Sequence, residues 1–373
     1  MKTESIHTKV IQVAEYGDAA GLTESLRDAA SCLHSGGLVA FPTETVYGLG
    51  ADALNDTAAN RIYTAKGRPS DNPLIVHISG VEALEELAVP TGTAYQLAQA
   101  FWPGPLTMIL PKRDIVPCAT TGGLDTVALR MPSHPVALEL IRQSGVYVAA
   151  PSANTSGRPS PTRAEHVVED MMGRIDYIVD GGAVGIGIES TIVDLSTDQP
   201  VILRPGFITR ERLEQMIGPV AMDPALEQTT ANLRPKAPGM KYTHYAPKGE
   251  LTLVEAESSV PEQSGMMSPA SGQQRVVDRI CELAGEKRRS GFRVGIMASA
   301  ETVSCYQEAA DLVVCVGDRQ QQSTVAAGLY AALREFDTAQ IDYIYSESFQ
   351  GGELSYAIMN RLLKAAGQRV IYV

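Results

Sequence analysis

The chain has 373 residues, of which 44% are hydrophobic and 20% charged, enough for two globular domains of ordinary size. Its net charge of −12 disfavours non-specific binding of nucleic acid, because like charges repel the phosphate backbone. Five cysteines without a C-x-x-C pair argue against a disulfide framework and a thiolate zinc site. No run approaches the ~20 apolar residues of a membrane span, and the N-terminus lacks the apolar core of a secretory signal. We therefore expect a cytoplasmic protein that does not enter a membrane.

Up to residue 218, short β-rich runs alternate with helical patterns, as is typical of an α/β layered domain. The expected strands are 38–41, 74–78, 106–110, 127–131, 147–150, 177–179, 191–195 and 201–203. Helical spacing over 94–101 and 136–141 predicts two helices, with Gly145 as the stop of the second, and a further helix runs from near Thr57 to Lys66. Because several strands follow each other with no helix between them, the sheet is expected to be mixed and twisted.

A proline-rich segment, 219–250, is expected to link this domain to a second α/β unit over 251–373. The strands expected in the second unit are 251–254, 292–297, 312–316, 341–345 and 370–373, and its helices 275–287, 324–336 and 353–366. Regular alternation of strand and helix predicts a small, Rossmann-like doubly wound sheet. No G-x-G-x-x-G follows its first strand, so nucleotide binding there is unsupported.

Two polar segments of the first domain follow a strand or a helix. PTETVYGLG (42–50) leaves a buried strand with two threonines and a glutamate, and its two glycines are expected to turn the backbone closely around a small ligand. A simple polar turn is the alternative. KGRPSDNPL (66–74) places Lys66 and Arg68 at a helix end, where a guanidinium and an ammonium suit a polyphosphate. The alternative is that these cations only offset the helix dipole.

Three further segments have the character of binding loops. AAPSANTSGRPSP (149–161) brings hydroxyls and backbone amides to the end of a buried strand, where they are able to form an anion nest. A glycine-rich loop (180–195) leads into the next strand, and Arg204 ends another. A buried arginine requires a partner, either a protein carboxylate or a phosphate. H-E-x-x-H, G-x-S-x-G and the Walker motif are missing from the sequence, so the residues indicate a small-anion site without a covalent nucleophile or zinc.

In this order the motifs resemble the YrdC-type threonylcarbamoyl-AMP synthase family, over essentially all of residues 1–210. The residues that carry the resemblance are PTETVYGLG, KGRP with NPL, VALRMP, PSAN, and STIVD followed by LRPG. GMKYTHYAP (239–247) and the second α/β unit resemble the longer, two-domain members.

The resemblance implies a nucleotidyltransferase that combines L-threonine, bicarbonate and ATP into threonylcarbamoyl-AMP and pyrophosphate. Mg²⁺ is expected to accompany the triphosphate, with no protein ligand assigned. Other proteins are expected to transfer the threonylcarbamoyl group to the adenosine beside the tRNA anticodon, so stable tRNA binding is not expected.

The resemblance also implies roles for single residues. Threonine contacts fall on Thr45, His77, Arg130, Ala150 (through its backbone) and Ser190. Nucleotide contacts fall on Arg68, Asn72, Thr126, Ser152, Ser160, Arg204 and Tyr245. The catalytic group is Lys66, Arg68, Ser152 and Asn154.

The aromatic linker segment 239–247 is expected to close over the site as a lid and exclude water from a labile anhydride. The alternative is a spacer whose tyrosines dock on the second domain. Two other functions compete with adenylation: an RNA-binding factor without catalysis, which the net charge disfavours, and a related enzyme that transfers a carbamoyl group from carbamoyl phosphate.

Overall fold

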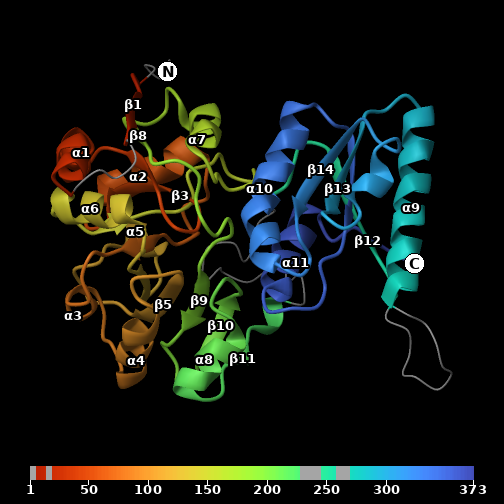
Figure 1. The fold of residues 1–373 in the computed structure, drawn as a ribbon. Helices are drawn as coiled ribbons and strands as arrows, with labels where there is room; N and C mark the ends of the chain where they lie inside the picture. Colours follow the sequence, from red (N-terminus) through yellow and green to blue (C-terminus); the bar gives the residue numbers. More distant parts are fainter. Residues whose placement is uncertain (1–5, 14–18, 227–244, 258–268) are drawn as a thin grey trace. The chain divides into compact units, whose positions relative to one another are not determined.

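The structure is a computed structural model that describes residues 6–13, 19–226, 245–257 and 269–373 (Figure 1). It divides into two compact units. The first comprises Met1–Ser156 and Ser160–Tyr242, and the second comprises Gly157–Pro159 and Thr243–Val373. No helix among the described residues is long and apolar enough to cross a membrane.

A single eleven-stranded sheet forms the centre of the first unit. Its strands are β1 (Lys9–Gln12), β2 (Val39–Pro42), β3 (Tyr47–Asp52), β4 (Ile75–His77), β5 (Leu106–Pro111), β6 (Thr126–Arg130), β7 (Val148–Ala149), β8 (Tyr177–Asp180), β9 (Thr191–Asp194), β10 (Val201–Arg204) and β11 (Ala221–Met222). They are ordered β1-β8-β2-β3-β7-β4-β6-β5-β9-β10-β11. Parallel pairs such as β4 with β6 and antiparallel pairs such as β5 with β6 occur side by side, so the predicted mixed sheet is confirmed.

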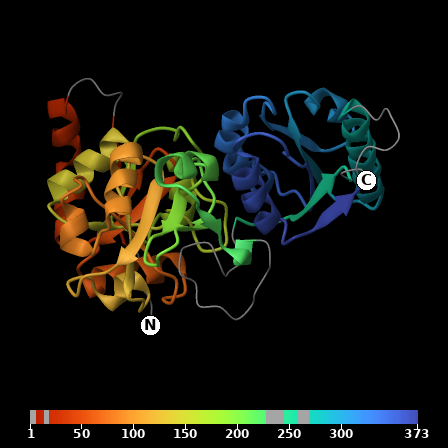
Figure 2. The same ribbon diagram turned by 90° about the horizontal axis from the view of Figure 1, so that it is seen from below.

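Helices cover the two faces of this sheet unequally. They are α1 (Ala19–His34), α2 (Asp56–Lys66), α3 (Ala83–Leu87), α4 (Gly92–Phe101), α5 (Cys118–Thr121), α6 (Pro135–Ser144), α7 (Ala164–Met171) and α8 (Arg210–Ile217). On one face, α1 and α6 pack side by side (Figure 2). Helices α2, α3, α4, α7 and α8 contribute to the large core on the other face.

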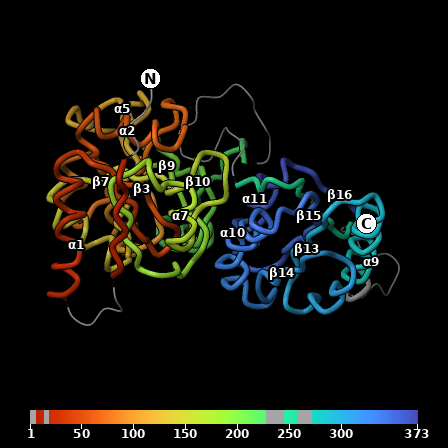
Figure 3. The backbone as a smooth tube through the Cα atoms, turned by 90° about the horizontal axis from the view of Figure 1, so that it is seen from above, coloured from red at the N-terminus to blue at the C-terminus, as the bar shows by residue number. Residues whose placement is uncertain are grey.

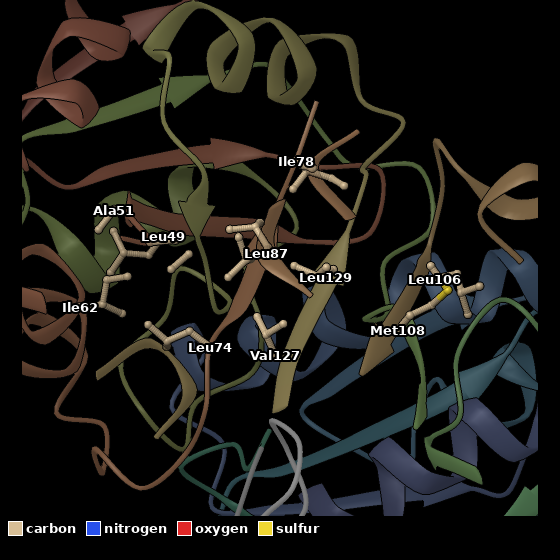
Figure 4. Packing of buried hydrophobic residues seen from close by; sticks show 14 of the residues in the cluster. Leu49, Ala51, Ile62, Leu74, Ile78, Leu87, Leu106, Met108, Val127 and Leu129 are labelled. Carbon is tan, nitrogen blue, oxygen red and sulfur yellow. The ribbon is translucent and has the colours of Figure 1, made fainter. Parts of the chain in front are cut away.

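The alternation of strand residues builds these two cores. The large core takes one set of side chains, among them Leu49, Val127 and Leu129 (Figure 4). On the opposite face the intervening residues form two smaller clusters. One of them contains only strand residues, with no helix contributing: Ile75, Ile109, Ala128, Ile192 and Leu203. This strand-only cluster marks the part of the sheet face on which the polar residues described below are found.

The structure corrects one sequence prediction in the PTETVYGLG segment. Its two glycines were expected to turn the backbone around a ligand, but Gly48 and Gly50 lie inside β3, which pairs antiparallel with β2. A Cβ on Gly50 would lie 2.7 Å from Val148 Cγ1 and 2.8 Å from Phe41 Cε1. The glycine therefore permits close packing between strands, and the turn itself is Thr43–Val46.

In the second unit a five-stranded sheet lies between helices, as the sequence predicted. Its strands are β12 (Glu250–Glu255), β13 (Val294–Ser299), β14 (Leu312–Gly317), β15 (Tyr343–Glu347) and β16 (Val370–Tyr372), all parallel and ordered β14-β13-β15-β12-β16. Figures 1 and 3 show α9 (Pro269–Arg289) on one side of this sheet and α10 (Gln322–Thr338) and α11 (Ser355–Ala365) on the other.

Candidate active site

Two predicted site residues, His77 and Arg130, share one face of the first unit's sheet with a third polar residue, Thr107. His77, Thr107 and Arg130 each lie two residues from a member of the strand-only cluster, so their side chains project from the same face as that cluster. Their exposed fractions are 3%, 0% and 4%. Burying polar groups is costly unless they find partners, so the contacts of these residues define what the site is able to bind.

A tight polar turn, Thr43–Val46, connects β2 to β3 and brings Thr45 to the site. Thr43 Oγ1 lies 2.9 Å from Thr45 Oγ1 and donates to the Val46 carbonyl, which closes the turn. The glycine-rich loop binds the turn from outside, because the N–H of Ile186 donates to the Glu44 carbonyl and that of Gly187 to the Thr45 carbonyl. Two segments predicted separately from the sequence thus form one structure.

Beside this turn, Arg130 and His77 end the adjacent parallel strands β6 and β4 and are paired in register. Arg130 Nη2 lies 2.8 Å from Glu44 Oε1, an ion pair whose side chains are 5% and 13% exposed. Burial and the Arg130 guanidinium lower the pKa of His77 to about 3, so its ring is neutral at pH 7. The His77 Nδ1–H donates to the Ile75 carbonyl.

Lys66, the last residue of helix α2, binds the loop of residues 151–154 (PSAN), called the PSAN loop below. Its side chain is buried, and Nζ donates to the carbonyl oxygens of Ser152 and Asn154. Ser152 Oγ in turn donates to Asn154 Oδ1, while Gly67, with φ 63°, ends the helix in the left-handed conformation. Lys66, Ser152 and Asn154 therefore lie together, with the lysine donating to the loop carbonyls, whereas Arg68 donates to the carbonyls of Asn72 and Pro73.

Arg68, Asn72 and Thr126 gather at the opposite end of β4 and β6. Arg68 donates to the carbonyl oxygens of Asn72 and Pro73. Asn72 is 2% exposed, and its Oδ1 accepts no hydrogen bond within the described part of the chain. Thr126 opens β6 four residues before Arg130, roughly 13 Å along the strand. Arg68, Asn72 and Thr126, predicted for nucleotide, thus lie at one end of this strand pair, and His77 and Arg130, predicted for threonine, lie at the other.

Ser190 joins β9 to its neighbours. Its hydroxyl lies 2.8 Å from Thr107 Oγ1 and accepts from Arg204 Nη2 at 3.0 Å, and its carbonyl accepts from Arg204 Nε. The buried Arg204 thus finds partners in a hydroxyl and a carbonyl. Ser160 donates to Glu189 Oε1 at 2.6 Å, which ties the end of the PSAN segment to the glycine-rich loop.

Two residues that were predicted to contact a substrate, Ala150 and Tyr245, make other contacts in the structure. The N–H of Ala150 donates to the Ile75 carbonyl, so this amide serves the backbone. Tyr245 belongs to the second unit, where its ring lies 5.1 Å from that of Tyr330. Most of the expected lid, residues 239–244, lies outside the described residues, so the lid stays a prediction. Among the described residues no group of three His, Cys, Asp or Glu is placed to hold a metal ion.

Comparison with known proteins decides the family. Residues 31–206 match a family described as "Telomere recombination", and residues 208–367 match "Threonylcarbamoyl-AMP synthase, C-terminal domain". The threonylcarbamoyl-AMP synthase of Bacillus subtilis is 51% identical over 93% of this chain and 94% of its own length. The chain belongs to the threonylcarbamoyl-AMP synthase family. A relative of the same name from Pyrococcus abyssi is 47% identical, over 93% of this chain and 96% of its own length.

The two-domain architecture of this family is also found in a solved structure. The crystal structure of Pyrococcus abyssi Sua5 complexed with L-threonine superposes with a TM-score of 0.86 at 44% identity. The match covers 98% of this chain and 99% of that chain. The likeness therefore includes the second unit, and this threonylcarbamoyl-AMP synthase family member is of the long form, as the sequence predicted.

Sequence reasoning missed several buried polar residues around the site. They are Thr43, Glu44, Thr107, Asp170 and Glu189. Glu44 was inside a quoted motif, and its position between two threonines after an apolar strand was a usable signal. Asp170 lies on α7, where it accepts the N–H of Thr155, and a carboxylate on an amphipathic helix gives no such signal.

Proposed function

We propose that this chain is an L-threonylcarbamoyladenylate synthase that converts L-threonine, bicarbonate and ATP into threonylcarbamoyl-AMP and pyrophosphate. The observation that carries the proposal is the near full-length likeness, at 51% identity, to a relative named threonylcarbamoyl-AMP synthase. The threonine bound by the Pyrococcus abyssi relative supports an amino-acid substrate. The product serves the threonylcarbamoyl modification of the tRNA adenosine beside the anticodon.

The two ends of the β4–β6 pair suit two substrates. Arg130, His77, Thr45, Ala150 and Ser190 are proposed to hold threonine, and Arg130 offers its carboxylate a planar set of donors. Arg68, Asn72 and Thr126, at the other end of the pair, are proposed to hold ATP together with Ser152, Ser160, Arg204 and Tyr245. The two ends lie roughly 13 Å apart along the strand. This distance is comparable to the length of a product that joins an amino acid to a nucleotide.

The chemistry follows as a nucleotidyl transfer. A carbamate oxygen of N-carboxy-threonine attacks the α-phosphorus of ATP, the bond to the β-phosphate breaks, and pyrophosphate leaves with its electron pair. Mg²⁺ enters as part of the substrate, MgATP. No protein nucleophile is required, so positioning and charge supply the catalysis. Lys66 holds the Ser152–Asn154 loop in one conformation, which is the positioning that such a mechanism needs.

The proposal leaves transfer to tRNA to other proteins. An overall charge of −12 gives the chain little long-range attraction for tRNA. The product is proposed to pass to threonylcarbamoyl-transferase proteins. We also propose that residues 1–218 carry the chemistry, with 219–250 as a linker and 251–373 as a separate α/β domain.

Pyrophosphate release from ATP tests the function, with threonine and bicarbonate omitted in turn. We expect release to require both, whereas release without threonine would refute the proposal. Carbamoyl phosphate as the productive co-substrate would favour carbamoyl transfer, and salt-dependent RNA binding without turnover would favour the RNA-binding alternative. Arg130→Ala is expected to raise the KM for threonine and Arg68→Ala that for ATP. Arg27→Ala, at a surface ion pair with Glu24, serves as the control.

A further inference from the structure

Glu44 lies in the site without a function in the reaction as set out above. Its backbone is held in the Thr43–Val46 turn and by the N–H of Ile186, so its side chain leaves a fixed point. The carboxylate forms an ion pair with Arg130 at 2.8 Å. Apart from this ion pair, both carboxylate oxygens, and Nε and Nη2 of Arg130, are buried and make no further hydrogen bond to any described residue. The pair balances charge while part of its hydrogen-bonding capacity stays unused.

The pair matches the two charged ends of an α-amino acid. A carboxylate needs donors such as Arg130, and an ammonium group needs acceptors such as the oxygens of Glu44. Buried polar groups that lack hydrogen bonds destabilise a fold, so a ligand that supplies both partners would bind with that cost relieved. Because Glu44 and Arg130 carry opposite charges, a zwitterion enters without adding net charge.

The titratable neighbours of Glu44 do not offer a second base. His134 is coupled to Glu44 by charge, but burial lowers its pKa and its Nδ1 accepts the N–H of Val136 at the start of α6. His77 is neutral, with Nδ1 donating to a backbone carbonyl. Glu44 is thus the anionic acceptor among these groups.

We propose that Glu44 binds the α-amino group of threonine and accepts the proton that this amine loses on carboxylation. The inference rests on the proposed function and concerns its first step. Threonine binds as the ammonium form and reacts with bicarbonate: a C–N bond forms, water leaves, and one proton passes to the Glu44 carboxylate. The products are the carbamate, water and a neutral Glu44, which then returns its proton to solvent. Atoms and charges balance without any further reactant.

The test is the pH profile of threonine-dependent pyrophosphate release in Glu44→Gln. The amide keeps the size and an acceptor oxygen but takes no proton, so kcat/KM for threonine is expected to fall about 100-fold or more at pH 7. The deficit should shrink by up to about tenfold per pH unit above pH 7, as free amine becomes available without a base. A merely structural role would lower activity equally at every pH, and parallel profiles would overturn the inference.

Two companion variants keep the test decisive. Glu44→Asp retains the base but withdraws it from the amine, so the KM for threonine should rise about tenfold or more while the pH profile keeps the wild-type shape. If Glu44→Gln fails to fold, an unchanged threonine KM in Glu44→Asp would refute the role. Glu24→Gln, an exposed glutamate paired with Arg27, controls for the charge change. An inactive wild type would refute the proposed function, whereas an active wild type with parallel profiles refutes only this inference.

Discussion

Lys66→Met is expected to destabilise the first unit markedly, because the lysine is the buried charged anchor of a loop that strand β3 and Asp170 also hold. The ammonium group is buried and donates to the carbonyls of Ser152 and Asn154. Hydrogen bonds from a charged donor contribute about 1.5–3 kcal/mol each. Methionine has a similar volume and brings no charge that would have to be buried. We therefore take the lower bound of this range for the two lost hydrogen bonds, about 3 kcal/mol, as the expected loss of unfolding free energy. For a unit of this size that corresponds to a Tm lower by roughly 6–12 °C.

Differential scanning fluorimetry measures this shift, and pyrophosphate release measures its effect on activity. Lys112→Met is the matched control, because Lys112 Nζ also donates to a backbone carbonyl, that of Val116 at 3.0 Å, but from a half-exposed position. We expect the control to lose less than about 1 kcal/mol. Equal Tm values for the two variants would refute the view that Lys66 anchors the loop containing Ser152 and Asn154.

Three further changes test other parts of the fold. Gly50→Ala should cost about 1–3 kcal/mol in urea unfolding, because its Cβ would overlap two buried side chains, whereas Gly285→Ala on α9 meets nothing within 4 Å and should not destabilise. His77 is neutral in the fold down to pH about 3, while an unfolded histidine protonates near 6.5. The unfolding free energy should therefore fall by up to about 1.4 kcal/mol per pH unit as the pH drops below 6.5, and urea titrations at pH 7 and 5 should show a smaller drop in His77→Gln. Glu347→Ala leaves Arg319 without its buried carboxylate and should cost about 3–5 kcal/mol in thermal unfolding of the second unit.

Much of the fold was predictable because its strands are apolar and its helix signals are local. The predicted strand at 74–78 coincides with β4, and Gly145 ends α6 with φ 65° as expected. Strand β3 was missed because two glycines inside a strand resemble a turn, and their packing reason exists only after Phe41 and Val148 meet. Strand β1 was missed as well, because its exposed residues give no apolar pattern.

The site was predictable as a set of segments, but its internal contacts were not. The sequence placed Lys66 in one motif and Ser152 and Asn154 in another, and only the fold shows that the lysine donates to the loop carbonyls. The partner of Arg204 was left open between a carboxylate and a phosphate, whereas the structure supplies Ser190. Such pairings depend on strand order, which periodicity does not determine.

Two buried glutamate side chains, one in each unit, differ in how their hydrogen-bonding groups are satisfied. In the second unit Glu347 is fully buried, yet it accepts from Tyr306, Ser299 and Arg319, so a dense set of hydrogen bonds surrounds its charge. In the first unit the carboxylate oxygens of Glu44, apart from the ion pair with Arg130, and Oδ1 of Asn72 are buried with no hydrogen bond to a described residue. A fold gains nothing from leaving such groups unsatisfied, and natural proteins rarely do so. Stability therefore explains the network around Glu347, whereas we propose that a ligand completes the hydrogen bonds of Glu44 and Asn72.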